Sequence, residues 1–283
     1  MKKLTPSRRK SKLSIAVPAS LVAEYANLRD KTEVIGHVAR SAAIFRADEV
    51  VIYPDQPDES ALSKLILGYV ETPQYLRKHL YAVRPELQYA GTLPPLRTPH
   101  HQLEAHAANL RIGEFREGVL FDQQGVNVVD VGVEKPIQMV GKAPSRGSRV
   151  TVKITEAGPE PRCEMAKRAE IPVYWGYEIQ ASKKTLGDLA SGGYYDLTIA
   201  TSRTGAPFAT EEERLKVKLA DARAVLVAFG SPRAGIQEIL KREHREVADC
   251  FQFNINTVPE QGTETVRTDE AVHATLAVLN LLP

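Results

Sequence analysis

The stretches AVLVAFGSPRAGIQEIL (Ala224–Leu240) and CFQFNINTVPEQGTETVRTDEA (Cys250–Ala271) decide the fold expected for this chain. Each stretch begins with an apolar run of strand length and continues into a loop rich in Gly, Pro, Ser and Thr, and a helical pattern follows each loop. Loops at the carboxyl ends of parallel strands are where open α/β sheets hold ligands. The two units are expected to lie side by side, and they predict one pocket built mostly from backbone N–H and C=O groups.

The same α/β pattern extends toward the N-terminus. Leu13–Val17, Val50–Ile52 and Asp196–Thr201 are predicted as further buried strands, and the last is expected to end in the loop SRTGAPF. Apolar residues between positions 35 and 45 recur at helical spacing. A helix that precedes a buried strand indicates a parallel sheet with crossover helices.

An insertion interrupts this pattern. GTLPPLRTPHH, which starts at Gly91, carries three prolines and cannot continue a helix or a central strand. Short strand-like segments with Gly and Pro between them follow, which are typical of a small β-barrel. Pro159 and Pro161 are expected to close the insert, and VYWGYEI (Val173–Ile179) to restart the main domain as a strand. The sequence thus predicts a basic leader over residues 1–12, an α/β domain over 13–92 and 168–283, and an inserted barrel over 93–167.

Composition limits the protein class. The 283 residues are 43% hydrophobic and 25% charged, which is ordinary for a globular protein. We expect no membrane span and no secretory signal, because no apolar run is long enough and no apolar segment follows the basic N-terminus. Two cysteines favour a reducing, cytoplasmic setting over a disulfide framework. A net charge of +2 restricts any RNA-binding surface to a local patch.

Three predicted strands end in polar loops, at residues 201–205, 230–235 and 256–267. Ordinary βα connections are one interpretation, but these are usually about 2–6 residues long, so the length of the last loop favours a function. Neither a Walker P-loop nor a G-x-G-x-x-G motif is present, which argues against a phosphate-cradling nucleotide site. His100, His101 and His106 have no Cys nearby, so we expect no metal site there but a linker or an RNA-facing polar patch.

Three segments resemble the three motifs of the SPOUT superfamily, the knotted S-adenosylmethionine-dependent RNA methyltransferases. They are IGHVARSAAIFRADEVVI (Ile35–Ile52), LVAFGSPRAG (Leu226–Gly235) and FNINTVPEQGTETVRTDEAVHATLAVL (Phe253–Leu279). Together with REG, HH, YWGYEI and YDLTIATS elsewhere in the chain, they are similar to an archaeal and eukaryotic SPOUT family with an OB-like insertion.

The resemblance implies an α/β fold of SPOUT type: a knotted, Rossmann-like parallel sheet with an inserted small OB-like β-barrel. It implies a homodimer formed through the knot region, and S-adenosylmethionine held by the knot loops. The residues it assigns to the cofactor are Thr201, Gly230, Ser231, Gly235, Asn256, Thr257, Gln261, Gly262, Thr263, Thr265 and Val266.

Catalytic roles follow from the same resemblance. Arg40 matches the arginine of the first motif, and a guanidinium can stabilise negative charge on a ribose or uracil oxygen. Arg267, at the start of the last helix, could bind phosphate or orient the target base. Val34 and Pro232 stand where the motifs often have Asn and Glu, which leaves a base nitrogen as a target beside the ribose 2′-hydroxyl. The predicted function is methylation of ribosomal or transfer RNA, and the alternative is an RNA-binding assembly factor that holds the cofactor without efficient transfer.

RNA contacts are expected from cations of the barrel and the leader. Aromatic residues are scarce in the insert, so phosphate contacts are expected there in place of base stacking. The candidate RNA-binding residues are Lys10, Arg111, Arg116, Lys142, Arg146 and Arg149.

Overall fold

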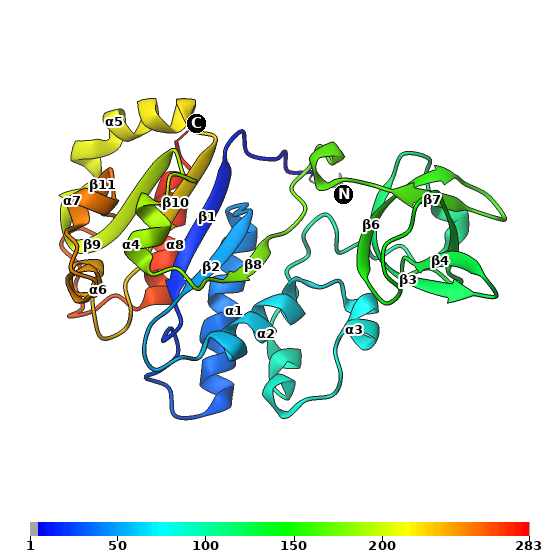
Figure 1. Ribbon diagram of the computed structural model, residues 1–283, viewed down its shortest axis with the longest axis horizontal. Helices are drawn as coiled ribbons and strands as arrows, with labels where there is room; N and C mark the ends of the chain where they lie inside the picture. The colour runs from blue at the N-terminus through cyan, green and yellow to red at the C-terminus, as the bar shows by residue number, and fades with distance from the viewer. Residues whose placement is uncertain (1–4, 283) are drawn as a thin grey trace. The chain divides into compact units, whose positions relative to one another are not determined.

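The computed structural model describes residues 5–282, and the chain forms two compact units. One unit, residues 9–70, 86–94 and 177–282, contains a six-stranded sheet with its helices. The other unit, residues 5–8, 71–85 and 95–176, contains a closed β-barrel (Figure 1). The predicted fold class, an α/β parallel sheet with an inserted barrel, is confirmed.

The sheet has the strand order β11-β9-β10-β1-β2-β8, and every pairing in it is parallel. Its central strands are almost continuous apolar runs, as expected for a parallel sheet that helices cover on both faces. The strands are β1 (Lys12–Pro18), β2 (Glu49–Tyr53), β8 (Glu178–Ala181), β9 (Leu197–Pro207), β10 (Ala224–Ala228) and β11 (Phe253–Asn256).

The helices vary from one turn to 17 residues, and the longest begins at a well-formed cap. Asn27 precedes that helix, and its side chain accepts a hydrogen bond from the backbone N–H of Asp30 at 2.9 Å. Within the described residues, no helix has both the length and the apolar character needed to cross a bilayer. The helices are α1 (Leu28–Ile44), α2 (Ser60–Glu71), α3 (Gln74–Leu80), α4 (Leu186–Ser191), α5 (Phe208–Asp221), α6 (Ile236–Arg242), α7 (Val247–Cys250) and α8 (Thr268–Leu279).

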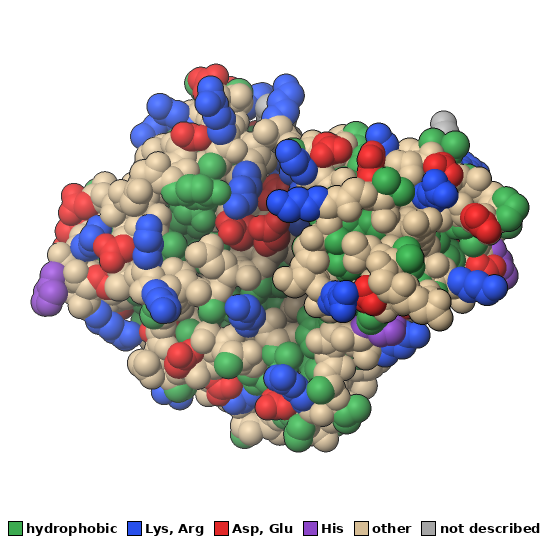
Figure 2. Space-filling view, turned by 45° about the vertical axis from the view of Figure 1, so that its right-hand side comes forward, with side chains coloured by type: hydrophobic (Ala, Val, Ile, Leu, Met, Phe, Trp, Pro, Cys, Tyr) green, Lys and Arg blue, Asp and Glu red, His purple; other side chains and the backbone are tan. Residues whose placement is uncertain are grey.

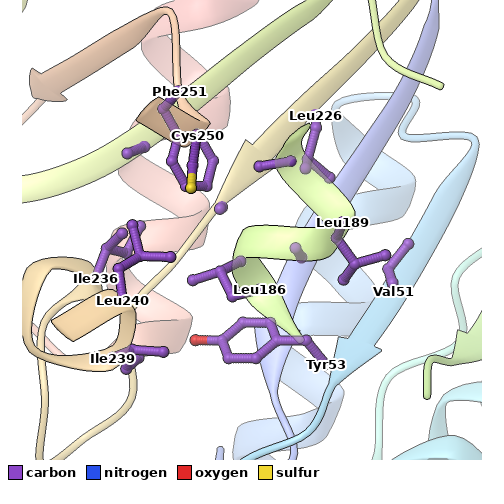
Figure 3. Close-up of a cluster of buried hydrophobic side chains, with 14 of the residues drawn as sticks. Val51, Tyr53, Leu186, Leu189, Leu226, Ile236, Ile239, Leu240, Cys250 and Phe251 are labelled. Atoms are coloured by element: carbon purple, nitrogen blue, oxygen red, sulfur yellow. The ribbon is translucent and has the colours of Figure 1, made fainter. Parts of the chain in front are cut away.

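Helices cover the two faces of the sheet. On one face, Leu186 of α4 and Leu240 of α6 are buried in the same cluster as Val51, Tyr53 and Leu226 of the strands (Figure 3). The Tyr53 hydroxyl donates to the carbonyl of Phe229 at 2.7 Å, just after the end of β10. On the other side, α1 and α8 pack against each other (Figure 1). The loop after β10 is thus anchored by a buried side chain from a different strand.

The barrel has the strand order β3-β4-β5-β7-β6 and closes by pairing of β6 with β3. Only the β5–β7 pairing is parallel. Gly118 allows the strands to approach closely, because a Cβ there would lie 2.2 Å from a methyl of Val129. The strands are β3 (Phe115–Gln123), β4 (Val126–Asp130), β5 (Ile137–Val140), β6 (Arg149–Glu156) and β7 (Arg162–Met165).

A buried polar network joins the barrel to the segments beside it within the same unit. Arg149 donates from Nη1 to Glu71 at 2.5 Å and from Nε to Glu117 at 2.6 Å, and each carboxylate side chain is only 5% exposed. His100 Nε2 lies 2.9 Å from Glu71, and Trp175 Nε1 donates to Glu117 at 2.6 Å. The nearby positive charges hold the pKa of Glu71 down at about 2 against the effect of burial.

Of the two interpretations of the histidine segment, a linker or an RNA-facing polar patch, the second is wrong for His100. His100 is fully buried, and His101 is half-buried against the backbone carbonyl of Glu71, with Nε2 at 2.6 Å. Burial lowers the pKa of His101 to about 4, because the charged form loses hydration. His106 is exposed and pairs with Glu134 at 2.9 Å.

Several predicted element boundaries are also wrong. The segment SRTGAPF was expected to be a loop, but β9 continues to Pro207, because its second half pairs with Ile255 and Asn256 of β11 after a register shift. β9 also lies between β10 and β11, so the two units quoted first are not direct neighbours. β7 follows Pro161, so the last strand of the barrel comes after the two prolines and within the predicted range of 93–167. Of VYWGYEI, only the last two residues belong to a named strand.

The leader is partly integrated into the fold. Residues 1–4 lie outside the described residues, and Lys12 already belongs to β1. The Arg9 guanidinium donates to the carbonyl of Phe45 at 3.0 Å and to the side chain of Asn280 at 3.0 Å. Lys10 is exposed.

Candidate cofactor and RNA site

A cavity of about 420 Å³ lies at the carboxyl ends of β9, β10 and β11. Its walls are the second half of β9, the loop after β10, the loop after β11 and one side of α8. The lining residues are Thr201–Thr204, Phe229–Gly235, Gln237, Glu238, Ile255–Val258, Gln261, Glu264–Val266, Thr268, Ala271 and Thr275. The predicted pocket at the ends of parallel strands is therefore present, with three strands contributing to it.

The loop after β10 is a tight turn. The backbone N–H of Ser231 donates to the carbonyl of Ala234 at 2.9 Å, and the N–H of Ala234 donates to the Ser231 hydroxyl at 3.1 Å. A Cβ at Gly230 would lie 3.0 Å from the Ala234 carbonyl oxygen and 3.1 Å from the Cα of Gly235. Glycine at position 230 therefore allows the backbone to fold back on itself and present its polar groups to the cavity.

The loop after β11 is held to β9 by side chains. The Asn256 amide donates to the carbonyl of Arg203 at 2.9 Å and accepts from the N–H of Val258 at 2.9 Å. The Arg203 guanidinium donates in turn to the carbonyl of Glu264 at 2.8 Å, and the Gln261 amide donates to the same carbonyl at 3.1 Å. These bonds satisfy backbone groups of a long loop that has no regular secondary structure.

The first turns of α8 complete the wall. The Thr268 hydroxyl donates to the carbonyl of Gly230 at 3.1 Å, and the hydroxyls of Thr257 and Thr275 lie 2.8 Å apart. The helix therefore starts beside the loop after β10, although its own chain arrives from β11 on the far side of β9.

Opposite charges face the cavity. Among the described residues, its cations are Arg203 and Arg233, and its anions are Glu238 and Glu264. Arg203, Arg233 and Glu238 were not predicted as site residues. Arg203 and Arg233 lie within the polar loops predicted at the strand ends, and this position was the signal in the sequence that could have indicated them.

Most of the residues that the resemblance assigned to the cofactor line this cavity. Gly262 and Thr263 do not, and a Cβ at Gly262 would meet no atom within 4 Å. Those that do are Thr201, Gly230, Ser231, Gly235, Asn256, Thr257, Gln261, Thr265 and Val266.

Neither of the two predicted catalytic arginines is among the residues that line the cavity. Arg40 is half-buried on α1, and Arg267 directly precedes α8, between two lining residues. The Arg267 guanidinium lies over the ring of Tyr25 at 5.8 Å, and its backbone N–H donates to Glu270 at 2.8 Å. Burial raises the pKa of Tyr25, and the positive charge of Arg267 opposes this effect.

The predicted RNA-binding cations of the barrel divide into two groups. Arg111, Lys142 and Arg146 are exposed, and Arg146 pairs with Asp122 at 2.7 Å. Arg116 is fully buried and donates to the carbonyls of Val131 and Glu104, at 3.0 and 2.8 Å.

Arg149 pairs with Glu71 and Glu117, so carboxylates of the protein engage its guanidinium, although 28% of its side chain is exposed. On the face that Figure 2 shows, Lys and Arg side chains are interspersed with Asp and Glu. No single basic face is apparent in this view.

An open parallel sheet with a polar cavity at its strand ends defines an α/β protein that binds a small-molecule ligand or cofactor. Comparison with known proteins identifies the family. Residues 12–279 match the family described as "Putative RNA methyltransferase", and the chain belongs to this family. It is an RNA methyltransferase, an enzyme that requires a methyl donor.

Relatives match along nearly the whole chain. An uncharacterized protein of Halobacterium salinarum is 35% identical over 288 residues, which cover 95% of this chain and 98% of that protein. The 28S rRNA (uridine-N(3))-methyltransferase of Homo sapiens is 31% identical over 303 residues, with 94% of this chain and 77% of that protein covered. The enzyme of the same description from Mus musculus is also 31% identical, with 94% and 75% covered.

Proposed function

We propose that this enzyme is a SPOUT-type methyltransferase that uses S-adenosylmethionine to methylate N3 of a uridine in large-subunit ribosomal RNA. The observation that carries the proposal is the cavity at the ends of β9, β10 and β11, whose lining contains most of the residues that the SPOUT resemblance assigns to the cofactor. The substrate is taken from the human and mouse relatives, which are 31% identical and are named for that reaction.

The lining residues fit S-adenosylmethionine. The cavity volume of about 420 Å³ lies within the range of about 300–1,000 Å³ that is usual for small-molecule sites. Backbone groups around Gly230 can hydrogen-bond the adenosine, and Ile255, Val258 and Ala271 offer apolar surface to its base. When bound, the cofactor supplies a methyl group already activated on a positively charged sulfur.

The side chains of this chain would position the uridine and take its proton. N3 of uridine must lose a proton as it accepts the methyl group, and we assign Glu264 as the acceptor. Glu238, the other carboxylate of the cavity, lies in the first turn of α6. Arg40 would stabilise the negative charge that develops on the uracil oxygens, and Arg267 would orient the base.

The chain path supports a knot. The segment after β11 starts at one edge of the sheet, and α8 nevertheless begins at the carbonyl of Gly230 and packs on α1. In the proposed homodimer, α1 and α8 form the contact, because Ile44 is 48% exposed and Leu281, just after α8, is 83% exposed. The barrel would bind RNA through exposed cations such as Lys142.

Calorimetric titration of the purified protein with S-adenosylmethionine is the first test, and stoichiometric binding is expected. Transfer of labelled methyl to an unmodified transcript of large-subunit rRNA, followed by nucleoside analysis, should then give 3-methyluridine. A 2′-O-methylated nucleoside would contradict the assignment of the base nitrogen. Cofactor binding without methyl transfer to rRNA would contradict the proposed reaction and favour an assembly factor.

Arg40→Ala tests the mechanism. The variant should bind S-adenosylmethionine as the wild type does and show a kcat at least about 10-fold lower, since one charge-stabilising group is worth that much or more. An unchanged kcat would refute the catalytic assignment of Arg40.

A further inference from the structure

The two arginines that line the cavity differ in their partners. The Arg203 guanidinium donates to the carbonyl of Glu264 at 2.8 Å, and the Arg203 carbonyl accepts from Asn256 at 2.9 Å. Arg203 therefore holds the loop after β11 against β9. The side chain of Arg233 is exposed and makes no hydrogen bond or ion pair with any residue that the structure describes.

The backbone around Arg233 is fixed although its side chain is not. Arg233 is the third residue of the turn from Ser231 to Ala234, which the two hydrogen bonds at 2.9 and 3.1 Å close. Pro232 precedes it and restricts φ at the second position. Ala234 and Ile236 after it are buried, and they anchor the turn to the core. Because the backbone of the turn is already fixed, little backbone entropy is lost when the guanidinium at its tip binds a ligand.

From this arrangement we infer that Arg233 binds a backbone phosphate of the RNA next to the nucleotide that enters the cavity. The inference rests on the proposed function of the same site. The reacting base must reach the cavity while its phosphates stay outside, and the unpaired guanidinium lies at the cavity wall. Arginine binds phosphate with two parallel N–H···O bonds, which sets orientation as well as affinity.

Arg233→Gln tests this inference by RNA binding, which does not depend on catalysis. Filter binding of an unmodified large-subunit rRNA transcript is measured at several salt concentrations. The variant should bind about 10-fold more weakly at low salt. The slope of log K against log salt should become shallower by about 1, the contribution of one phosphate contact. Arg233→Lys should recover part of the affinity and the full salt slope, because it keeps the charge and loses the paired geometry.

Two matched variants separate this effect from others. Arg223→Gln removes an exposed arginine just before β10, at the opposite end of the strand, and should change neither affinity nor slope. Arg203→Gln releases the loop after β11, so it should weaken calorimetric binding of S-adenosylmethionine more than Arg233→Gln does, whereas Arg233→Gln should have the larger effect on the salt slope of RNA binding.

Equal RNA affinity and equal salt slope in wild type and Arg233→Gln would overturn the inference, even if the wild type methylates rRNA. A wild type that binds no S-adenosylmethionine would refute the proposed function instead, and the comparison of RNA affinities would still decide the role of Arg233.

Discussion

Arg149 was selected from the sequence as an RNA contact, and the structure predicts a different result for its removal. Arg149→Met deletes the cation that lies 2.5 Å from Glu71 and 2.6 Å from Glu117, whose side chains are each 5% exposed. Breaking a buried ion pair from one side typically costs about 3–5 kcal/mol, because the remaining charge stays buried without compensation. Glu71 keeps His100 and Glu117 keeps Trp175, so we expect the lower part of that range, about 3 kcal/mol.

Urea unfolding measures this cost directly. Trp175 is the only tryptophan of the chain, and it is buried within the same network, so its fluorescence reports on the unit that contains the barrel. Arg146→Met is the matched control, because its pair with Asp122 involves a side chain that is 70% exposed. Such a surface pair is worth about 0–1 kcal/mol.

The pH dependence of the stability difference between the wild type and Arg149→Met is a second test of this reasoning. Without Arg149, the pKa of Glu71 in the folded variant should rise from its wild-type value of about 2, because one of its positive partners is lost. The folded variant then takes up a proton at a higher pH than the folded wild type, so the stability gap between them should narrow as the pH falls from 4.5 toward 2. Unchanged stability of Arg149→Met together with reduced RNA affinity would refute this reasoning. It would support the original prediction that Arg149 contacts RNA.

Two further results are expected. The pKa of His101 is about 4 in the folded protein against an ordinary 6.5, so the unfolded state protonates first and stability should fall by up to about 3 kcal/mol as the pH drops from 6.5 to 4. His101→Gln should remove that fall in urea titrations across pH, whereas a fall that persists in the variant would assign it to other groups. Ala271→Leu should fill part of the cavity and weaken S-adenosylmethionine binding at least about 10-fold by calorimetry, since the added side chain occupies ligand volume. Gly262→Ala, where a Cβ meets no atom within 4 Å, should bind normally, and equal losses in both variants would place the cofactor elsewhere.

The sheet and the cavity could be predicted from the sequence, because both depend on local patterns. Apolar runs such as that of Ala224–Ala228 are buried from both faces, and turn residues mark where such strands end. Parallel strands bring their carboxyl ends to one edge, so Gly230 and Asn256 could be placed at one cavity without knowledge of strand order. The order itself was not available, and β9 separates the two strands that the sequence placed side by side.

The errors concern features that distant partners decide. Residues 202–207 do not alternate between apolar and polar side chains, so no strand was predicted there. They form the end of β9 because the segment pairs with β11. Arg149 and Glu71 are separated by 78 positions, so the sequence shows a cation but not the carboxylate that neutralises it. Arg116 is fully buried because the carbonyls of Val131 and Glu104 satisfy its donors. A buried charge is tolerated only when it is paired and hydrogen-bonded, and this condition is met in three dimensions, not along the chain.

This division of the arginines bears on how the enzyme would recognise RNA. A net charge of +2 means that acidic residues nearly balance the cations, and Arg116 and Arg149 are paired with groups of the protein itself. Non-specific attraction, which grows with the number of neutralised phosphates, would therefore be weak. Selection of one uridine would depend on the shape of the RNA and on a small number of well-placed contacts, and Arg233 beside the cavity is the one whose position is tied to the reacting nucleotide. The number of basic residues in such a sequence thus overstates its RNA surface, and the proposed contact of Arg233 would place the RNA at the cavity wall.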